Sequence, residues 1–261
     1  MKLGLDGKIV LVTGGSKGIG LACARAFAEE GARVAIASRS PENLERGRRE
    51  LAKGGFKVAV VIADFSQPID AQAAVRAAEE QLAPIDILIN SAGAAKRFSV
   101  DTYNADAWHQ GMDAKYFPYV HAMDAVRPGM MERRRGSIVN IIGMGGKMAQ
   151  PFHLSGGAAN AALMLVTVGW ANVLGPHGVR VNAINPAGTL TERVNQAMRL
   201  EAQTQGITEA EALERGQAKV PLRRYAQPEE VAAVALFLAS EKASYINGAV
   251  IPMDGGAVPV I

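Results

Sequence analysis

The chain has little of what marks disulfide-stabilised or metal-binding proteins. Its 261 residues include one cysteine, Cys23, and four histidines, and aromatic residues make up 5%. A single cysteine excludes an internal disulfide and is typical of a reducing compartment, so we expect a cytoplasmic protein. Cys23 lies in an apolar helical pattern, which predicts burial. No Cys/His cluster has the spacing of metal ligands, so we predict no metal site.

The chain also has little excess of positive over negative charge. Lysine and arginine number 28 against 25 acidic residues, a net charge of +3. The basic run Arg133 to Arg135 is typical of the solvated end of a helix, so we expect no nucleic-acid partner. We find no apolar run of signal-peptide or membrane length, and we expect no membrane partner.

What the chain does have is a regular alternation of short β-branched runs with longer helical patterns. The runs that predict strands are "KIVLVT", "RVAIAS", "KVAVVIAD", "IDILIN", "GSIVNII", "GVRVNAINP" and "GAVIPMDGG". Helical patterns lie between them, notably over 104–132, 158–174 and 228–240. Seven strands in this order predict an α/β fold with a Rossmann-type, doubly wound parallel sheet, in a single domain over 1–261.

The segment 190–222, here called the lid segment, is polar and lies between the sixth strand and the last helix. Two interpretations stay open at this point. It is either a surface excursion or, because it follows the carboxyl end of a strand, a mobile substrate lid.

The first strand leads directly into "TGGSKGIG" and then a helix, the arrangement that cradles a pyrophosphate on backbone N–H groups. The candidate cofactor-binding residues in this loop are Gly14, Ser16, Lys17, Gly18, Ile19 and Gly20. The second strand ends in Ser38 and Arg39, where an acid usually meets free ribose hydroxyls. Arg39 and Lys17 can instead bind a 2′-phosphate, which favours NADP(H) over NAD(H). The alternative is that both are solvated surface cations.

Several motifs together resemble those of the single-domain short-chain dehydrogenases/reductases over essentially the whole chain. They are "TGGSKGIG", "AD" at 63–64, "NSAG" at 90–93, "GSIVN", "HGVRVNAINPAG" and "PEEVAAVALFLASEKASYINGAVIPMDGG". The resemblance implies further cofactor contacts at Asp64, Phe65, Asn90, Ala92, Gly93, Pro186, Thr189 and Thr191. Pro186-Ala187 stands where the family has Pro-Gly.

The same resemblance implies a catalytic tetrad of asparagine, serine, tyrosine and lysine, and here the chain departs from the family. Gap-free alignment on the flanking motifs places Lys115, Gly143, Gly156 and Asn160 at these positions. No Tyr-x-x-x-Lys occurs, and residues 133–180 contain no tyrosine. We therefore predict that the ordinary active site is absent.

Three groups are candidates to replace it. Lys115 stands where the family has its asparagine, and Asn160 stands where the family has its lysine. Lys115 therefore either faces Asn160 across the site and contacts the nicotinamide ribose or the substrate, or is a helix-surface cation. His153 is either an acid–base group or a solvated loop histidine. Lys96 and Arg97 either hold a carboxylate or phosphate or are a solvated pair. Pro118 is expected to kink the helix near Lys115.

Loss of a positioned general acid costs about 10²–10⁴ in rate. We therefore predict an atypical NADP(H)-dependent oxidoreductase acting on a small-molecule substrate, a bulky activated alkene or ketone, in a cavity enlarged by the two glycines. The alternatives are a non-redox lyase, hydrolase or isomerase, and a non-catalytic nucleotide-binding subunit. The resemblance also implies a homo-oligomer, a dimer or tetramer, formed through helices 104–132 and 158–174.

Overall fold

The computed structural model describes residues 2–93 and 95–258, which contain one sheet of seven parallel strands in the order β3-β2-β1-β4-β5-β6-β7. The strands are β1 (Ile9–Thr13), β2 (Arg33–Ser38), β3 (Ala59–Ile62), β4 (Ile87–Asn90), β5 (Gly136–Ile141), β6 (Val179–Pro186) and β7 (Val250–Met253). The predicted Rossmann-type sheet is confirmed. Because the chain runs outward from β1 to β3 and resumes at β4 on the other side of β1, a crevice forms at the carboxyl ends of β1 and β4.

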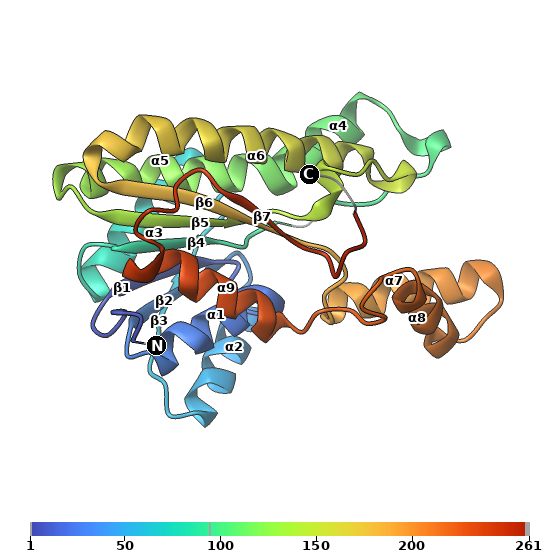
Figure 1. The fold of residues 1–261 in the computed structure, drawn as a ribbon, viewed down its shortest axis with the longest axis horizontal. Helices are drawn as coiled ribbons and strands as arrows, with labels where there is room; N and C mark the ends of the chain where they lie inside the picture. Colours follow the sequence, from blue (N-terminus) through green and yellow to red (C-terminus); the bar gives the residue numbers. More distant parts are fainter. Residues whose placement is uncertain (1, 94, 259–261) are drawn as a thin grey trace.

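Helices cover both faces of this sheet (Figure 1). They are α1 (Gly18–Glu29), α2 (Pro41–Lys53), α3 (Pro68–Gln81), α4 (Ala105–Gly111), α5 (Phe117–Glu132), α6 (Leu154–Leu174), α7 (Glu192–Gln205), α8 (Glu209–Ala218) and α9 (Pro228–Ala239). One core lies between the sheet and α3, α5 and α6, and a second lies between the sheet and α1, α2 and α9.

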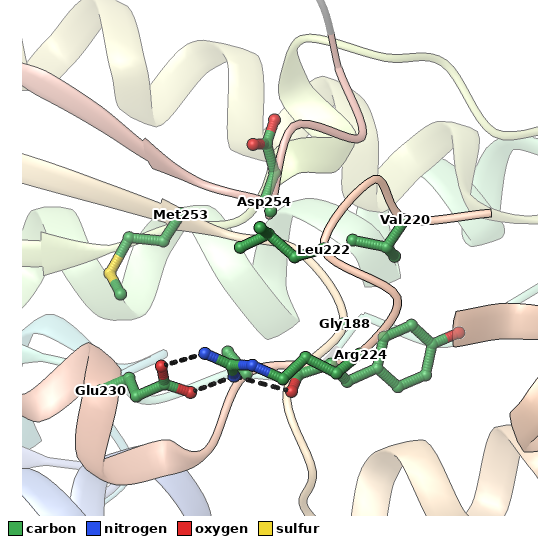
Figure 2. Close-up of a pocket in the computed structure, with 10 residues that line it drawn as sticks. Gly188, Val220, Leu222, Arg224, Glu230, Met253 and Asp254 are labelled. Carbon is green, nitrogen blue, oxygen red and sulfur yellow. Dashed lines mark hydrogen bonds and ion pairs between the residues drawn. The ribbon is translucent and has the colours of Figure 1, made fainter. Parts of the chain in front are cut away.

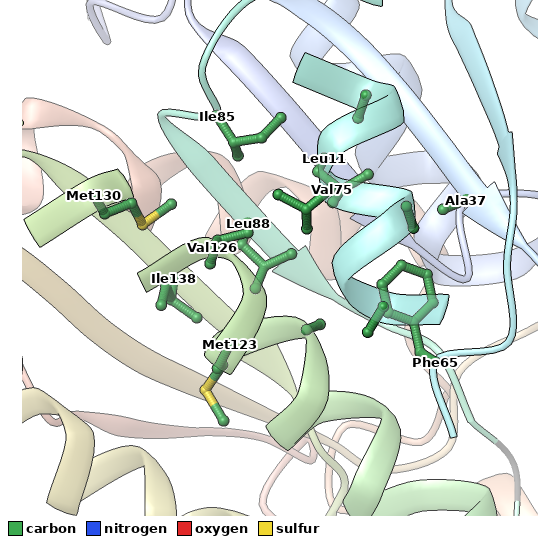
Figure 3. Close-up of a cluster of buried hydrophobic side chains, with 14 of the residues drawn as sticks. Leu11, Ala37, Phe65, Val75, Ile85, Leu88, Met123, Val126, Met130 and Ile138 are labelled. Atoms are coloured by element: carbon green, nitrogen blue, oxygen red, sulfur yellow. The ribbon is translucent and has the colours of Figure 1, made fainter. Parts of the chain in front are cut away.

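The apolar strands follow from this double coverage. Successive side chains of a strand point to opposite faces, so Leu11 packs towards α3 and α5 while Val10 and Val12 pack towards α1 and α9. Figure 3 shows the first of these cores, with Leu11 beside Val75 and Leu88. Cys23 is buried in the second core, as predicted, and burial raises the pKa of its thiol to about 12.

The structure refines one helix prediction. The expected helix 104–132 is α4 and α5 joined by a π-helical turn, η2 (Met112–Tyr116), which ends two residues before Pro118. A π-turn inserts an extra residue into a helix and is often found at functional sites. Helix α2 has a capped start, because Ser40 Oγ accepts a hydrogen bond from Asn43 N at 3.1 Å and Pro41 is the first helical residue.

The lid segment contains two helices that its polar sequence did not reveal, α7 and α8. They lie beyond the carboxyl ends of the strands, apart from the layered body (Figure 1). Within them only Ala202 and Ala212 are buried, which explains the polar composition. Helix α8 begins with a capping box in which Thr208 and Glu211 bond each other's backbone N–H groups.

The expectation that no apolar segment reaches membrane length was wrong. The helical stretch Pro151–His177 spans 27 residues with a mean hydropathy of 1.4, enough by length and composition alone to cross a membrane. Its composition has a local reason. One face of α6 packs on the sheet, and the opposite face is also apolar, with Leu165, Val168 and Val173 exposed.

Candidate active site

The glycine loop and the segment after β6 face each other at the crevice. Gly14 has φ +67°, and a Cβ there would lie 2.7 Å from Ser91 O, so this position needs glycine. Helix α1 begins at Gly18 with no side chain capping its first turn. A Cβ on Gly18 would lie 3.4 Å from Thr191 Cγ2. Thr191 therefore lies close to the free start of the helix, where backbone N–H groups without a partner can bind an anion such as a pyrophosphate.

Within this loop Ser16 is buried, whereas Lys17 is exposed at the N-cap of α1. Ile19 and Gly20 belong to the first turn of the helix. On the facing segment Pro186 ends β6, and the buried Thr189 forms a bridge with Ala226. These residues therefore lie around the same crevice, and their contact with a cofactor stays a prediction.

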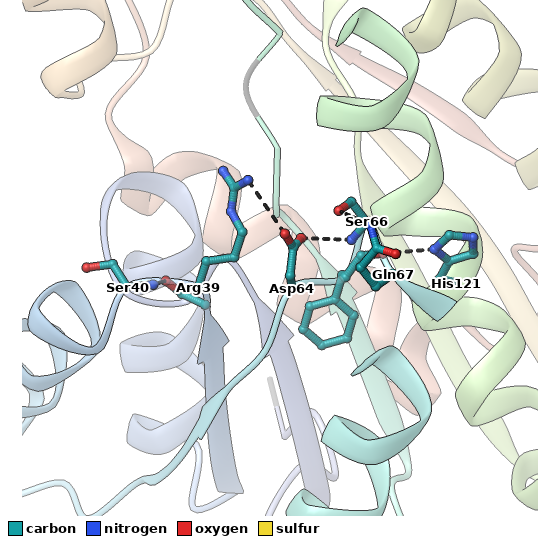
Figure 4. A network of polar contacts seen from close by, with 8 residues as sticks. Arg39, Ser40, Asp64, Ser66, Gln67 and His121 are labelled. Carbon is teal, nitrogen blue, oxygen red and sulfur yellow. Dashed lines mark hydrogen bonds and ion pairs between the residues drawn. The ribbon is translucent and has the colours of Figure 1, made fainter. Parts of the chain in front are cut away.

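The end of β2 supplies an exposed cation (Figure 4). The Arg39 side chain is 73% exposed, and its Nη1 lies 4.0 Å from Asp64 Oδ2, a weak pairing. Asp64 Oδ1 accepts a hydrogen bond from Ser66 N at 3.0 Å, and Ser38 Oγ accepts one from Ser40 N at 3.3 Å. The ring of Phe65 is buried in the core, so this residue can meet a cofactor only through its backbone. Arg39 remains free to bind an anion.

A buried hydrogen-bond network forms the floor of the crevice. Thr13 Oγ1 donates to Asn90 Oδ1 at 3.2 Å, and Asn90 Nδ2 donates to Asn140 Oδ1 at 2.9 Å. Thr13 Oγ1 also accepts from Ser91 N and Ala92 N, each at 3.3 Å. The Asn90 side chain is therefore committed to holding β1, β4 and β5 together. Gly93 lies next, close to the backbone of η2.

Lys115 points into the protein from the π-helical turn, so the alternative of a helix-surface cation is wrong. It is 8% exposed, and Nζ donates to Ile141 O at 3.0 Å and to Tyr119 Oη at 2.6 Å. Tyr119 Oη in turn donates to Ile141 O. Burial, with a smaller contribution from the charge of Arg193, lowers the pKa of Lys115 to about 7. In the ranges 2–93 and 95–258, no hydrogen bond joins Lys115 to Asn160.

At the position aligned with the serine, the backbone itself requires glycine. Gly143 has φ +131°, a region that other residues rarely adopt. Its N–H donates to Asn185 Oδ1 at 3.3 Å. A Cβ there would lie 3.3 Å from Asn160 Nδ2, so Asn160 faces Gly143. Asn160 Oδ1 is buried and has no hydrogen-bond partner among the residues described.

At the position aligned with the tyrosine, the space is occupied. A Cβ on Gly156 would overlap the His153 ring and lie 2.8 Å from Ala95 Cβ. The His153 imidazole therefore fills room that a longer side chain would need, and the expected enlargement of the cavity does not occur there. Partial burial lowers the pKa of His153 to about 4, with smaller contributions from Arg193, Arg97 and Lys115. Its Nδ1 has no partner within the described chain.

Two residues at this site were missed by the sequence analysis. Tyr119 is fully buried, and its spacing of four from Lys115 could have revealed the pair, because residues i and i+4 share a helix face. Arg193, near the start of α7, influences the pKa values of both Lys115 and His153. No sequence signal pointed to it, since its place depends on how the lid segment folds back.

The base of the lid segment encloses a small pocket (Figure 2). Arg224 closes one side through a double ion pair with Glu230, with both Nη–Oε distances 2.7 Å. The remaining lining residues are Gly188, Val220, Leu222, Tyr225, Ala226, Met253, Asp254 and Gly255. The returning lid segment thus packs on the end of β7.

The chain is similar to known oxidoreductases over nearly its whole length. A family model described as enoyl-(acyl carrier protein) reductase matches residues 14–258. The 2-(S)-hydroxypropyl-CoM dehydrogenase 3 of Xanthobacter autotrophicus is 34% identical over 98% of both chains. The 3-oxoacyl-[acyl-carrier-protein] reductase FabG of Thermotoga maritima is 32% identical, covering 97% of this chain and 99% of its own. The chain belongs to the short-chain dehydrogenase/reductase family of oxidoreductases.

Solved structures show the same fold. The L-sorbose reductase of Gluconobacter frateurii, complexed with NADPH and L-sorbose, superposes with a TM-score of 0.94 at 28% identity over the whole of both chains. An NAD+-bound xylitol dehydrogenase gives a TM-score of 0.90 at 27% identity, over 97% of this chain and 100% of its own. Structures of this kind thus include both NADPH-bound and NAD+-bound proteins.

Proposed function

We propose that this chain is an NADP(H)-dependent oxidoreductase that works without the family's catalytic tetrad. The observation that carries the cofactor assignment is the exposed guanidinium of Arg39, which follows β2 beside the open glycine loop. Lys17 adds a second exposed cation at the N-cap of α1. A 2′-phosphate is the group that two such cations would bind. The NADPH-bound relative supports the same choice.

The proposed loss of the tetrad rests on sequence and on local geometry. The chain has no Tyr-x-x-x-Lys. At the aligned positions, Gly143 has a backbone that disfavours serine, and the space beside Gly156 is filled by His153. At both positions the surroundings differ as well as the side chain, as expected if the mechanism has changed.

In this proposal the cofactor, when bound, supplies or accepts a hydride. Lys115 holds the exchangeable proton, because a pKa of about 7 makes its ammonium a competent acid at neutral pH. Tyr119 Oη and Ile141 O fix the Lys115 side chain. His153, with its pKa lowered to about 4, is neutral at pH 7 and positions the substrate by hydrogen bonding.

The substrate we propose is an activated alkene or ketone. With one weak acid in place of a tyrosine, serine and lysine, hydride transfer is best supported when the developing charge delocalises on the substrate itself. The His153 ring fills the space beside Gly156. Room for a bulky substrate therefore comes from the missing side chain at Gly143. Turnover without hydride transfer would instead indicate a lyase, hydrolase or isomerase. Nucleotide binding without turnover would indicate a non-catalytic subunit.

Calorimetric titration with NADPH and NADH tests the cofactor assignment. In Arg39→Ala, we expect NADPH affinity to fall about tenfold or more while NADH affinity changes little, since only NADPH carries the 2′-phosphate. Arg33→Ala is the matched control, because Arg33 is exposed at the opposite end of the same strand. If neither nucleotide binds the wild-type protein, the redox proposal is wrong.

We also propose a homo-oligomer formed through the outer face of α5 and α6. Leu165 is 75% exposed and Val173 57% exposed on this face. Both residues lie on α6, and large apolar side chains exposed on one long helix are typical of an interface between subunits. The solution mass from light scattering distinguishes a dimer or tetramer from a monomer.

A further inference from the structure

The lid segment brings a guanidinium onto the side of the site where the substrate is proposed to bind. Arg193, the second residue of α7, donates from Nη2 to Ala95 O at 3.4 Å, in the loop after β4. Ala95 also approaches Gly156 and thus lies next to the His153 ring. The same loop is joined to the turn before α6, because Phe98 N donates to Phe152 O at 3.1 Å. Three elements that are distant in sequence therefore meet around Arg193.

The groups that gather here are basic. Loss of hydration lowers the pKa of Arg193, and the nearby Arg97 lowers it further. Arg193 also lowers the pKa of Lys115, and Arg193, Arg97 and Lys115 all lower that of His153. Arg97 lies two residues after Ala95, whose carbonyl Arg193 contacts, and Ala95 itself lies beside the His153 ring, so these basic groups border one shared space.

No carboxylate neutralises this cluster within residues 2–93 and 95–258, where neither Arg193, Arg97 nor Lys115 forms an ion pair. Arg199, further along α7, shows the contrast: it lies 3.5 Å from Glu192 and 3.4 Å from Glu209. Like charges held together are mutually unfavourable unless an anion joins them. The cluster is therefore built to receive a negative charge.

We infer that the substrate carries an oxyanion group, a carboxylate, sulfonate or phosphate, which binds between Arg193 of the lid segment and Arg97 of the loop after β4. A planar guanidinium binds such groups through paired charge-assisted hydrogen bonds. An anion held by both residues would also join the lid segment to the body of the protein over the substrate. This inference rests on the proposed function, because it takes the space around Lys115 and His153 as the substrate site.

The subsite is distinct from the proposed phosphate-binding loop. Gly18 and Thr191 flank that loop, whereas Arg193 reaches Ala95, beside Gly156. Binding of a simple anion to Arg193 can therefore be measured both in the free protein and in the protein saturated with NADP+.

Calorimetry with benzoate and its neutral analogue benzamide provides the test. We expect benzoate to bind and benzamide to bind at least tenfold more weakly. In Arg193→Gln and in Arg97→Gln, benzoate affinity should fall about tenfold to a hundredfold, as expected when a charge-assisted hydrogen bond is lost. Arg199→Gln is the matched control, with the same charge change on the same helix, and should bind benzoate like the wild type. Methanesulfonate and inorganic phosphate, titrated in parallel, show which oxyanion fits best.

Equal binding of benzoate and benzamide, or equal weakening in Arg193→Gln and Arg199→Gln, would overturn the inference. So would an Arg193→Gln variant that loses NADP+ affinity but keeps benzoate affinity, because Arg193 would then belong to the cofactor site. Thermal unfolding of each variant confirms that it is folded. If the wild type binds benzoate through Arg193 but binds no dinucleotide, the proposed function fails and the anion subsite stands.

Discussion

The two halves of the crevice differ in whether their buried polar side chains have hydrogen-bond partners. Where β1 and β4 end, Thr13, Asn90 and Asn140 pair with one another in a closed network. Where β5 ends and α6 begins, His153 Nδ1, Ser155 Oγ and Asn160 Oδ1 are buried without a hydrogen-bond partner in the described chain. Buried polar groups are normally paired, and unpaired ones are costly.

The difference indicates which half is complete in the free protein. In the network beneath the glycine loop, the side chains of Thr13, Asn90 and Asn140 satisfy one another's hydrogen bonds without a ligand. The half that contains Lys115 and His153 has polar atoms that a bound molecule could satisfy. In the proposed function, the half that would bind the nucleotide keeps the family's sequence motif, whereas the half that would meet the substrate departs from it.

Replacing Lys115 should produce the largest effect. In Lys115→Met, we expect kcat to fall by about 10²–10⁴, because the proposed general acid is removed, while NADPH affinity stays near that of the wild type. The rate of NADPH oxidation is measured with the best substrate from a panel of activated alkenes and polycyclic ketones. Lys57→Met, at an exposed position before β3, is the matched control. Unchanged turnover in Lys115→Met would exclude Lys115 as the proton donor.

The titration of Lys115 should also make the free energy of unfolding depend on pH. Folding lowers the pKa of Lys115 from 10.5 to about 7. Below pH 7 both states are protonated, and the folded state bears the full cost of the buried ammonium. Between pH 7 and 10.5 the unfolded state holds more protons, so stability should rise with pH, by up to roughly 1.4 kcal/mol per unit.

Urea unfolding at pH 6, 8 and 9.5 checks this, with Lys115→Met as the reference that lacks the titration. We expect the wild type to gain stability relative to Lys115→Met as the pH rises. Parallel curves for the two proteins would mean that the Lys115 ammonium is well solvated in the folded state.

The seven parallel strands and the glycine loop could be predicted from sequence because each has a strong local signal. The strand "RVAIAS" matches β2 residue for residue, and Ser40-Pro41 marks the start of α2. The lid helices were missed, since a polar segment with little buried surface has no clear periodicity. Arg193 could not be placed from sequence because its contact with Ala95 joins residues 98 positions apart. The alignment gave Gly143 and Gly156, but neither the backbone angle of the first nor the ring beside the second.

Restoring a serine at Gly143 should destabilise the protein. At φ +131° a non-glycine residue is strained, and we expect Gly143→Ser to lower the free energy of unfolding by about 1–3 kcal/mol. Gly169→Ala is the control: it lies within α6, and a Cβ there would have open space around it, so a gain of up to about 1 kcal/mol is expected. Denaturant unfolding measures both. A Gly143→Ser variant as stable as the wild type would show that this turn adapts easily.

The last prediction compares the loss of a paired hydroxyl, at Thr13, with the loss of an unpaired hydroxyl, at Ser155. Thr13→Val keeps the shape of the side chain but leaves Asn90 Oδ1 and two backbone N–H groups without Thr13 Oγ1, so the free energy of unfolding should fall by about 1–3 kcal/mol. Ser155→Ala removes a buried hydroxyl that has no partner among the described residues, so the variant should be as stable as the wild type or more stable, by up to about 1–3 kcal/mol. Urea unfolding of the free protein compares the two directly. A loss in Ser155→Ala as large as that in Thr13→Val would mean that the Ser155 hydroxyl is satisfied in solution, and the two halves of the crevice would then be equally complete.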